Sequence, residues 1–193
     1  MQAEVDGRHL RDTELIAFLV LLFVAGNETT TNLINHAVRA LVLYPSEQRR
    51  LRERPELMPA FLEEVLRWES PIQGFYRRAR KDTEIGGVQV EKDQALLVLY
   101  GAANHDPAKY ECPAEVDGAR FAEETGTRDH LAFGAGIHYC LGANLARIGS
   151  GIAVGLLLER FSEIKELEGF EPGGWARRSS AGRRAFVVSV TAR

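Results

Sequence analysis

Residues 133–142 constrain the fold more than any other stretch, because they place a cysteine on a glycine-rich bend just before a long apolar segment. The run is Phe-Gly-Ala-Gly-Ile-His-Tyr-Cys-Leu-Gly, and the apolar residues that follow predict a helix over 141–161. A helix N-terminus carries partial positive charge and free N–H groups, which favour the thiolate, the form of cysteine that ligates metal. Glycines beside Phe133 let the backbone approach a flat, bulky group, because they lack a Cβ.

The residues alone leave three other uses of this bend open. Cys140 could be a free thiol that caps a core helix. The glycines could cradle a phosphate, although positions 134, 136 and 142 do not form the G-x-G-x-x-G pattern. A zinc ion could be held by His138, Cys140, His105 and Cys112, although no Cys-x-x-Cys pair is present.

Composition places the chain among cytoplasmic globular proteins. It has 193 residues, enough for a sizeable core, and a net charge of −3, which gives no reason to expect a nucleic-acid or anionic-membrane partner. Its two cysteines make no disulfide framework and fit a reducing cytosol. Residues 1–14 are polar and acidic, unlike a secretory signal peptide. The longest apolar run, 15–25, is shorter than the about 20 residues that span a bilayer, so it predicts a buried helix.

The remaining pattern predicts a mostly helical α+β fold. A long helix is expected over 12–44, with Asp12 or Thr13 as its cap, Pro45 as its stop and a first half that is buried because it is apolar all round. The other expected elements are helices over 46–54 and 59–68, strands over 84–90 and 95–100, and a terminal strand over 183–191 paired across a turn near 173–174.

The cysteine run resembles the haem-binding signature of the cytochrome P-450 family, Phe-Gly-x-Gly-x-His-x-Cys-x-Gly, at every fixed position. The resemblance implies that Cys140 is the axial thiolate ligand of the iron of haem b and that His138 hydrogen-bonds a haem propionate. It also implies a haem-binding loop shaped by Phe133, Gly134, Gly136 and Gly142.

A polar island interrupts the long helix. Residues 25–30, Ala-Gly-Asn-Glu-Thr-Thr, resemble the family's central-helix pattern Ala/Gly-Gly-x-Asp/Glu-Thr-Thr/Ser. Ala25 and Thr29 share one helix face, and Gly26 would leave room for a diatomic ligand. The resemblance implies that Ala25 lies at the haem, that Thr29 hydrogen-bonds iron-bound dioxygen and that Glu28 supplies protons. The alternative is that Thr29 bonds only to its own helix backbone.

Glu64 and Arg67 share a helix face at i and i+3 and resemble the family's Glu-x-x-Arg pair. The resemblance implies Arg120 as their third partner, in a structural trio that must be paired if it is buried. A similar quartet over 47–50, Glu-Gln-Arg-Arg, is interpreted as a solvated surface pair.

Two further arginines carry expectations. Arg77 resembles the family's arginine that binds a haem propionate, a role that suits the guanidinium fork. Arg147 would lie near the outer haem face where electron donors dock, or would be an ordinary surface arginine. The apolar residues over 72–75 would line the substrate side and indicate a hydrophobic substrate.

The resemblance covers almost the whole chain, which corresponds to the C-terminal half of the family fold: a single partial domain over 1–193 with two long helices flanking a haem site and small β-sheets. It implies a monooxygenase that inserts one atom of O2 into a small hydrophobic organic substrate. Electrons would come from a ferredoxin or flavodoxin with its reductase, with no nucleic-acid or membrane partner. The alternative is a truncated, non-catalytic haem-binding remnant, or a fragment that needs the missing half, with the apolar flank over 15–25 left open.

Overall fold

A computed structural model describes residues 4–5, 7–122, 129–167 and 188–192, and its longest element is helix α1 (Asp12–Leu43) of 32 residues. The helix ends one residue earlier than predicted, just before Pro45. The predicted caps Asp12 and Thr13 are wrong, because both residues lie inside the helix and Arg11 is the N-cap. The Arg11 backbone N–H donates to the Glu14 carboxylate at 3.0 Å, so an acidic side chain satisfies the helix start from its third position.

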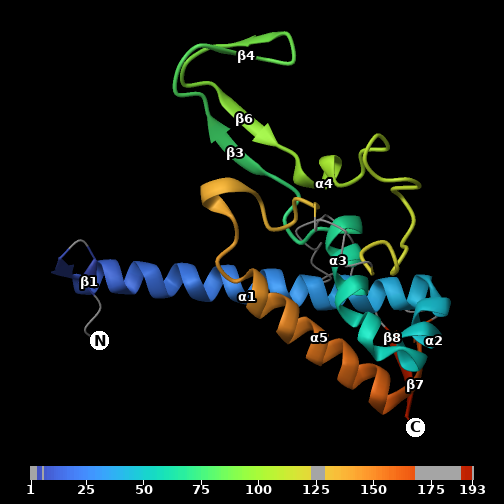
Figure 1. Ribbon diagram of the computed structural model, residues 1–193. Helices are drawn as coiled ribbons and strands as arrows, with labels where there is room; N and C mark the ends of the chain where they lie inside the picture. The colour runs from blue at the N-terminus through green and yellow to red at the C-terminus, as the bar shows by residue number, and fades with distance from the viewer. Residues whose placement is uncertain (1–3, 6, 123–128, 168–187, 193) are drawn as a thin grey trace.

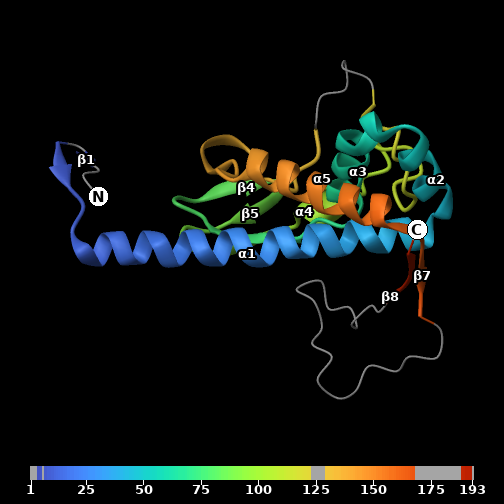
Figure 2. The ribbon, with the colours of Figure 1, turned by 90° about the horizontal axis from the view of Figure 1, so that it is seen from below.

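The two halves of α1 have different surroundings. Its C-terminal half buries Leu33, Ala37 and Leu41 in the core. The first turns of its N-terminal half project beyond the other helices (Figure 2), and Leu21 and Phe23 are 65% and 72% exposed. The predicted burial of this half is therefore wrong for this chain, because no described element covers it. The open apolar flank foreseen in the alternative interpretation is what the structure contains.

The core forms where three helices pack against α1, namely α2 (Pro45–Glu53), α3 (Met58–Trp68) and α5 (Ala143–Arg160). The 3-10 turn η1 (Pro55–Leu57) joins α2 to α3. Helix α3 is central to this group, with Phe61, Leu62, Val65 and Leu66 all buried. Helix α5 packs against both α1 and α3, which brings the end of the chain back to its long first helix.

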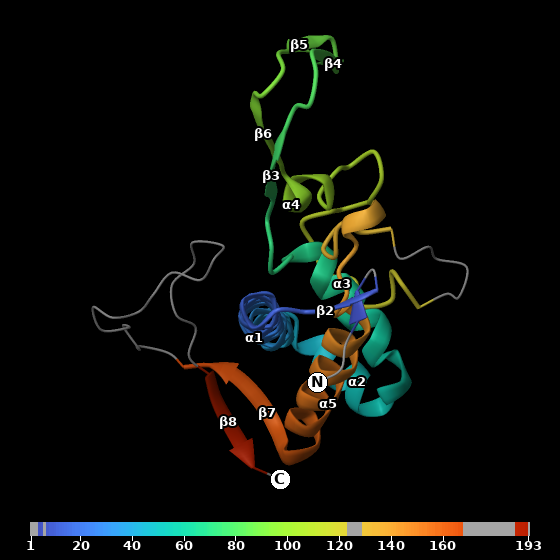
Figure 3. The same ribbon diagram turned by 90° about the vertical axis from the view of Figure 1, so that its left-hand side faces the viewer.

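Small antiparallel ribbons complete the fold. Strands β3 (Phe75–Arg78) and β6 (Ala95–Val98) pair, and at their outer end β4 (Thr83–Ile85) pairs with β5 (Val88–Val90), which makes an arm that extends from the helices (Figure 1). The other ribbons are β1 (Glu4–Val5) with β2 (Arg8–His9), and β7 (Phe161–Glu166) with β8 (Val188–Ala192). The β7–β8 ribbon lies on the other side of α1 from the arm (Figure 3).

The predicted elements agree with these ribbons only in part. The strand expected over 95–100 ends at Val98, and a short helix α4 (Tyr100–Ala103) follows it. Strand β3 was not predicted, because its run of charges hides the alternation that marks a strand. The turn near 173–174 and the start of the predicted terminal strand lie outside the described residues.

The fold class is confirmed as α+β and mostly helical. By length and composition, α1 is the one helix in the described part of the chain that could cross a membrane, and its apolar window is not buried. The core helix of a soluble protein meets the same criterion, so this finding alone does not assign α1 to a membrane.

Candidate haem site

The cysteine segment, defined here as residues 131–142, bends sharply before α5. Gly134 and Gly136 have φ angles of +71° and +67°, the left-handed region that residues with a Cβ rarely adopt. The Cys140 N–H donates to the Phe133 carbonyl at 2.9 Å, which closes the bend across its base. Helix α5 begins at Ala143, two residues later than predicted, so Cys140 lies just before the helix N-terminus and is exposed.

The surface around this thiol is apolar. Ile137 and Leu141 are 96% and 87% exposed, and Leu145 and Ile148 continue the apolar surface onto α5 at 75% and 61%. In Figures 1 and 2 the segment before α5 lies alongside the middle of α1. The Cys140 sulfur is therefore a single soft metal ligand, and large exposed apolar side chains surround it.

The donor set fits haem better than a bare metal ion. In the described part of the chain, no group of three or more His, Cys, Asp or Glu side chains could hold a metal ion. The zinc alternative therefore finds no support, and the His105 ring nitrogen Nδ1 lies instead 3.0 Å from the Gly101 carbonyl. Haem iron already has four ring nitrogens and needs only an axial ligand from the protein, so one cysteine beside apolar side chains suffices.

Two basic side chains assigned to the haem propionates are exposed. Arg77 in β3 donates to the Tyr100 hydroxyl at 3.1 Å and to the Tyr76 carbonyl at 3.0 Å. Over the described ranges, neither Arg77 nor His138 forms an ion pair with a carboxylate of this chain. Each can therefore accept a carboxylate from a bound molecule, and the structure does not bring the two side chains into contact with each other.

The polar island of α1 contains the hydrogen bond that the alternative interpretation foresaw. The Thr29 hydroxyl donates to the Ala25 carbonyl at 2.7 Å, one helical turn earlier. A Cβ placed on Gly26 would meet no atom within 4 Å, so no packing contact among the described residues requires glycine there. Glu28 is exposed, and no hydrogen bond joins it to Thr29 within the described part of the chain.

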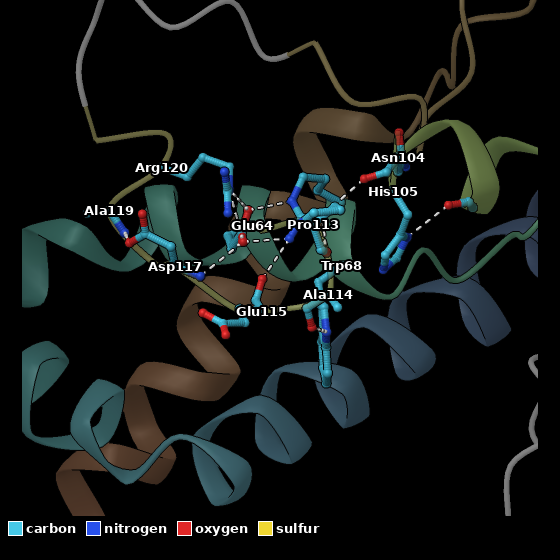
Figure 4. Close-up of polar contacts among 12 residues, drawn as sticks. Glu64, Trp68, Asn104, His105, Pro113, Ala114, Glu115, Asp117, Ala119 and Arg120 are labelled. Carbon is cyan, nitrogen blue, oxygen red and sulfur yellow. Dashed lines mark hydrogen bonds and ion pairs between the residues drawn. The ribbon is translucent and has the colours of Figure 1, made fainter. Parts of the chain in front are cut away.

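The structure brings Glu64, Arg67 and Arg120 together as one cluster, called here the Glu64 cluster (Figure 4). Arg67 binds the Glu64 carboxylate with two nitrogens at 2.8 and 2.7 Å, and both side chains are fully buried. Arg120 Nε lies 3.2 and 3.1 Å from the two carboxylate oxygens. The Asp117 backbone N–H adds a fourth donor at 3.0 Å, so this carboxylate is fully paired.

Arg67 also organises the irregular segment after α4. Its guanidinium donates to the backbone carbonyls of Asn104, Pro113 and Glu115 at 3.0, 2.8 and 2.9 Å. Asn104 is itself buried, and its side-chain oxygen accepts the Leu131 N–H at 2.7 Å. The cluster thereby reaches the start of the cysteine segment through Asn104.

A second buried carboxylate, Glu63, was missed by sequence reasoning. Arg147 binds it with two nitrogens at 2.6 and 2.9 Å, and His130 Nε2 lies 2.9 Å from it. We call these three residues the Glu63 cluster. Burial by itself would raise the pKa of Glu63, but the hydrogen bonds from Arg147 and His130 outweigh it and lower the pKa to about 2. Because Arg147 pairs with a buried carboxylate, it is not the ordinary surface arginine of the alternative expectation.

Residues 47–50, the second Glu-x-x-Arg quartet, are also not the solvated surface pair that was expected. Glu47 is buried, and one of its carboxylate oxygens has no hydrogen-bond partner among the described residues, although Arg50 contacts the other oxygen at 3.3 Å. Burial accordingly raises the pKa of the Glu47 carboxyl. Gln48 is buried as well and bonds the Leu41 carbonyl and both backbone groups of Ile164.

Comparison with known proteins identifies the family. The family model described as Cytochrome P450 matches residues 1–171. The chain belongs to the cytochrome P450 family. The sequence resemblance is therefore confirmed, and the residues of the P450 signature are those that form the bend described above.

Individual P450 relatives agree with the family match. The chain is 44% identical over 166 residues to cytochrome P450 107B1 of Saccharopolyspora erythraea, a match that covers 86% of this chain and 40% of the relative. The structure of cytochrome P450 CYP109Q5 from Chondromyces apiculatus matches with a TM-score of 0.85 at 34% identity, over 99% of this chain and 48% of that one. The crystal structure of CYP109E1 from Bacillus megaterium in complex with corticosterone matches with a TM-score of 0.81 at 32% identity, over 98% and 49%. The chain thus spans less than half the length of these P450 proteins.

Proposed function

We propose that this chain carries the thiolate-ligating part of a haem monooxygenase, which inserts one atom of O2 into a small hydrophobic organic substrate and reduces the other to water. The observation that carries the proposal is Cys140, an exposed thiol on a bend closed by the Phe133 carbonyl, in a chain of the P450 family. Haem, when bound, would supply the activation of O2, because a thiolate ligand favours O–O cleavage.

The residues of this chain would bind the haem and deliver protons to it. Cys140 would ligate iron, Arg77 would bind one haem propionate and His138 would hydrogen-bond a propionate, and both of these side chains are exposed. Gly134, Gly136 and Gly142, with Phe133, would shape the bend that brings the thiol forward. On α1, Ala25 and Gly26 would leave space at the haem, Thr29 would place a hydroxyl there and Glu28 would deliver protons from solvent.

Thr29 would have to change its hydrogen bond for this role. Its hydroxyl proton now goes to the Ala25 carbonyl, so the oxygen keeps its acceptor capacity but not a free donor. A rotation of the hydroxyl would release the proton toward a ligand beside α1. The Glu64 cluster would have no part in the chemistry and would hold the scaffold behind the cysteine segment.

The exposed apolar side chains of the chain bear on the kind of substrate. The apolar side chains around Cys140 and along the first half of α1 favour a small hydrophobic substrate, and the relative CYP109E1 was crystallised with corticosterone. We propose a ferredoxin or flavodoxin with its reductase as the electron donor. We also propose that residues 1–193 act as a single partial domain in the cytoplasm, without a nucleic-acid or membrane partner.

Replacement of each cysteine tests the proposal. The chain would be titrated with haemin, reduced and exposed to carbon monoxide, and its absorbance compared between Cys140→Ser and Cys112→Ser. Cys112 is the matched control because it is also an exposed free thiol. We expect the band typical of thiolate-ligated haem in the unsubstituted chain and in Cys112→Ser, and its loss in Cys140→Ser. A band that survives Cys140→Ser would refute Cys140 as the ligand.

One observation favours a second function, a haem-binding piece without activity of its own. The apolar side chains of α1 from Ile16 to Val24 are exposed, whereas a helix that is apolar all round is normally covered. A polypeptide equivalent to the rest of the P450 fold would have to cover them. Size-exclusion chromatography during the haemin titration separates the two functions: a monomer with one tightly bound haem supports the enzyme, and weak haem binding by associated chains supports the second function.

A further inference from the structure

The Glu63 cluster lies between α3 and the two sides of the cysteine bend. The side chains of Glu63 and His130 are 3% and 1% exposed, and that of Arg147 is 15% exposed. The Ala132 N–H lies 3.3 Å from His130 Nδ1, and His130 Nε2 lies 2.9 Å from the Glu63 carboxylate, so both ring nitrogens are paired. Arg147 brings a guanidinium cation to this buried carboxylate.

Arg147 connects this carboxylate to both sides of the bend. Its guanidinium carbon lies 4.5 Å from the centre of the Phe133 ring, and its Nη1 donates to the Tyr139 hydroxyl at 3.3 Å. The rings of Phe133 and Tyr139 are 6.3 Å apart, and the ring of His130 lies 6.1 Å from that of Phe133. A cation over an aromatic face is an attractive contact, and these tilted ring pairs lie within the distance range of favourable aromatic contacts.

The backbone passes this constraint directly to Cys140. Phe133 supplies the carbonyl that accepts the Cys140 N–H, and Tyr139 is the residue before the cysteine. The tip of the bend has little packing of its own, since Ile137 is 96% exposed. The order of the bend must then come largely from the buried residues to which its two sides are attached.

We propose that Glu63, Arg147 and His130 are positioning residues that fix the backbone on either side of Cys140, so that its sulfur is presented to haem iron from a preformed bend. The proposal rests on the proposed function for the identity of the ligand. It assigns Arg147 an internal role in place of a surface role at the outer haem face. The bidentate fork of arginine is essential to it, because one side chain must bind Glu63 and cover Phe133 together.

The chain offers a matched control for Arg147. Arg39 of α1 binds Glu69 at 2.7 Å, with side-chain exposures of 22% and 3%, and its guanidinium lies 5.0 Å from the centre of the Trp68 ring. This pair combines a buried carboxylate, an arginine and an aromatic ring in the same way, but outside the cysteine segment. Arg39→Ala and Arg147→Ala should therefore cost similar global stability.

Hydrogen–deuterium exchange of the haem-free chain tests the proposal without any activity. In Arg147→Ala we expect amides of the cysteine segment, including that of Cys140, to exchange at least about tenfold faster than in the unsubstituted chain. Arg39→Ala should leave them unchanged relative to the core helices, and Arg147→Lys, which keeps the charge but not the fork, should fall between. Equal acceleration of the segment by Arg147→Ala and Arg39→Ala would overturn the proposal.

A second measurement separates this proposal from the proposed function. After haemin loading, Arg147→Ala should lower the fraction of carbon monoxide-bound protein that shows the thiolate band, whereas Arg39→Ala should not. Absence of that band in the unsubstituted chain would refute the function, while the exchange data would still decide whether the cluster orders the bend. If circular dichroism shows that Arg147→Ala does not fold, Glu63→Gln and Arg147→Lys decide by the same two measurements.

Discussion

Glu63 and Glu64 are neighbours on α3, yet their carboxylates bind different parts of the molecule. Glu64 pairs with Arg67 on its own helix and with Arg120, whereas Glu63 pairs with Arg147 of α5 and lies beside His130. Adjacent residues on a helix point in directions about 100° apart, since a turn takes 3.6 residues. One short stretch of helix can therefore fix both the irregular segment after α4 and the bend that carries Cys140.

The two clusters differ in whether the sequence could predict them. The Glu64–Arg67 pair is three residues apart and follows from helix geometry alone. Arg147 and His130, the partners of Glu63, lie 84 and 67 residues away along the chain, so no local sequence pattern predicts them. Both carboxylates are buried to a similar degree. A pair that can be predicted from sequence spacing is therefore not more buried than one that cannot.

The largest effect is expected at the Glu64 cluster. Arg67→Ala should lower the free energy of unfolding by about 3–5 kcal/mol, because it removes two of the four donors to the fully buried Glu64 carboxylate and takes the guanidinium away from three backbone carbonyls. Urea unfolding followed by circular dichroism measures it. The control is Arg54→Ala, which breaks the exposed pair with Glu56 and should change stability by less than about 0.5 kcal/mol. Similar values for the two variants would contradict the contrast between buried and exposed pairs.

The next effect concerns acid stability through the Glu63 cluster. The folded pKa of Glu63, about 2, lies below its ordinary value of 4.5, so the contribution is present above pH 4.5 and is lost as pH falls toward 2. The difference corresponds to about 3 kcal/mol. Urea unfolding at a series of pH values should show a shallower acid loss in Glu63→Gln than in the unsubstituted chain.

Glu47 gives this pH experiment an internal check of opposite sign. Burial raises its folded pKa, so protonation of Glu47 at low pH favours the folded state and partly offsets the loss at Glu63. Glu47→Gln should therefore make the acid loss steeper. A shallower loss in both variants would show that the opposite pKa shifts are not the cause.

The smallest effect tests the bend that the Glu63 cluster holds. Gly136→Ala should cost about 1–2 kcal/mol, because alanine must adopt the φ of +67° that glycine adopts freely. Gly149→Ala in α5 is the control: its Cβ would meet no atom within 4 Å, and it should stabilise the chain by about 1 kcal/mol through helix propensity. Thermal unfolding of the two variants should give shifts of opposite direction, and a loss in both would contradict this account.

Sequence reasoning succeeded where the determining contacts are local. Pro45 ends α1, the spacing of Glu64 and Arg67 gives their pair, and the glycines before Cys140 give the bend. It failed where a distant partner decides. Glu47 is buried against Gly118, far along the chain, although its charged neighbours indicate solvent. The start of α1 is a separate, local error, because Glu14 and not Asp12 or Thr13 satisfies it.

The glycines of α5 show the same division. Glycines stand at positions 149, 151 and 155, but a Cβ added at Gly151 alone would meet atoms of another described element within 4 Å, the nearest being Leu62 Cδ1 at 3.7 Å. The sequence marks a small residue but not its neighbour. Which face of α5 meets α3 depends on how the two helices cross.

The amino-acid sequence by itself determined the family, the helices, the cysteine bend and the pairing within α3, because each depends on residues a few positions apart. Only the tertiary structure decided that Arg147 turns inward to Glu63, that Glu47 is buried and that the first half of α1 stays uncovered. The reason is that burial and the pairing of charges depend on which distant segments arrive beside a residue. Which segments pack beside a residue depends on the fold of the whole chain and cannot be read from one short stretch of sequence.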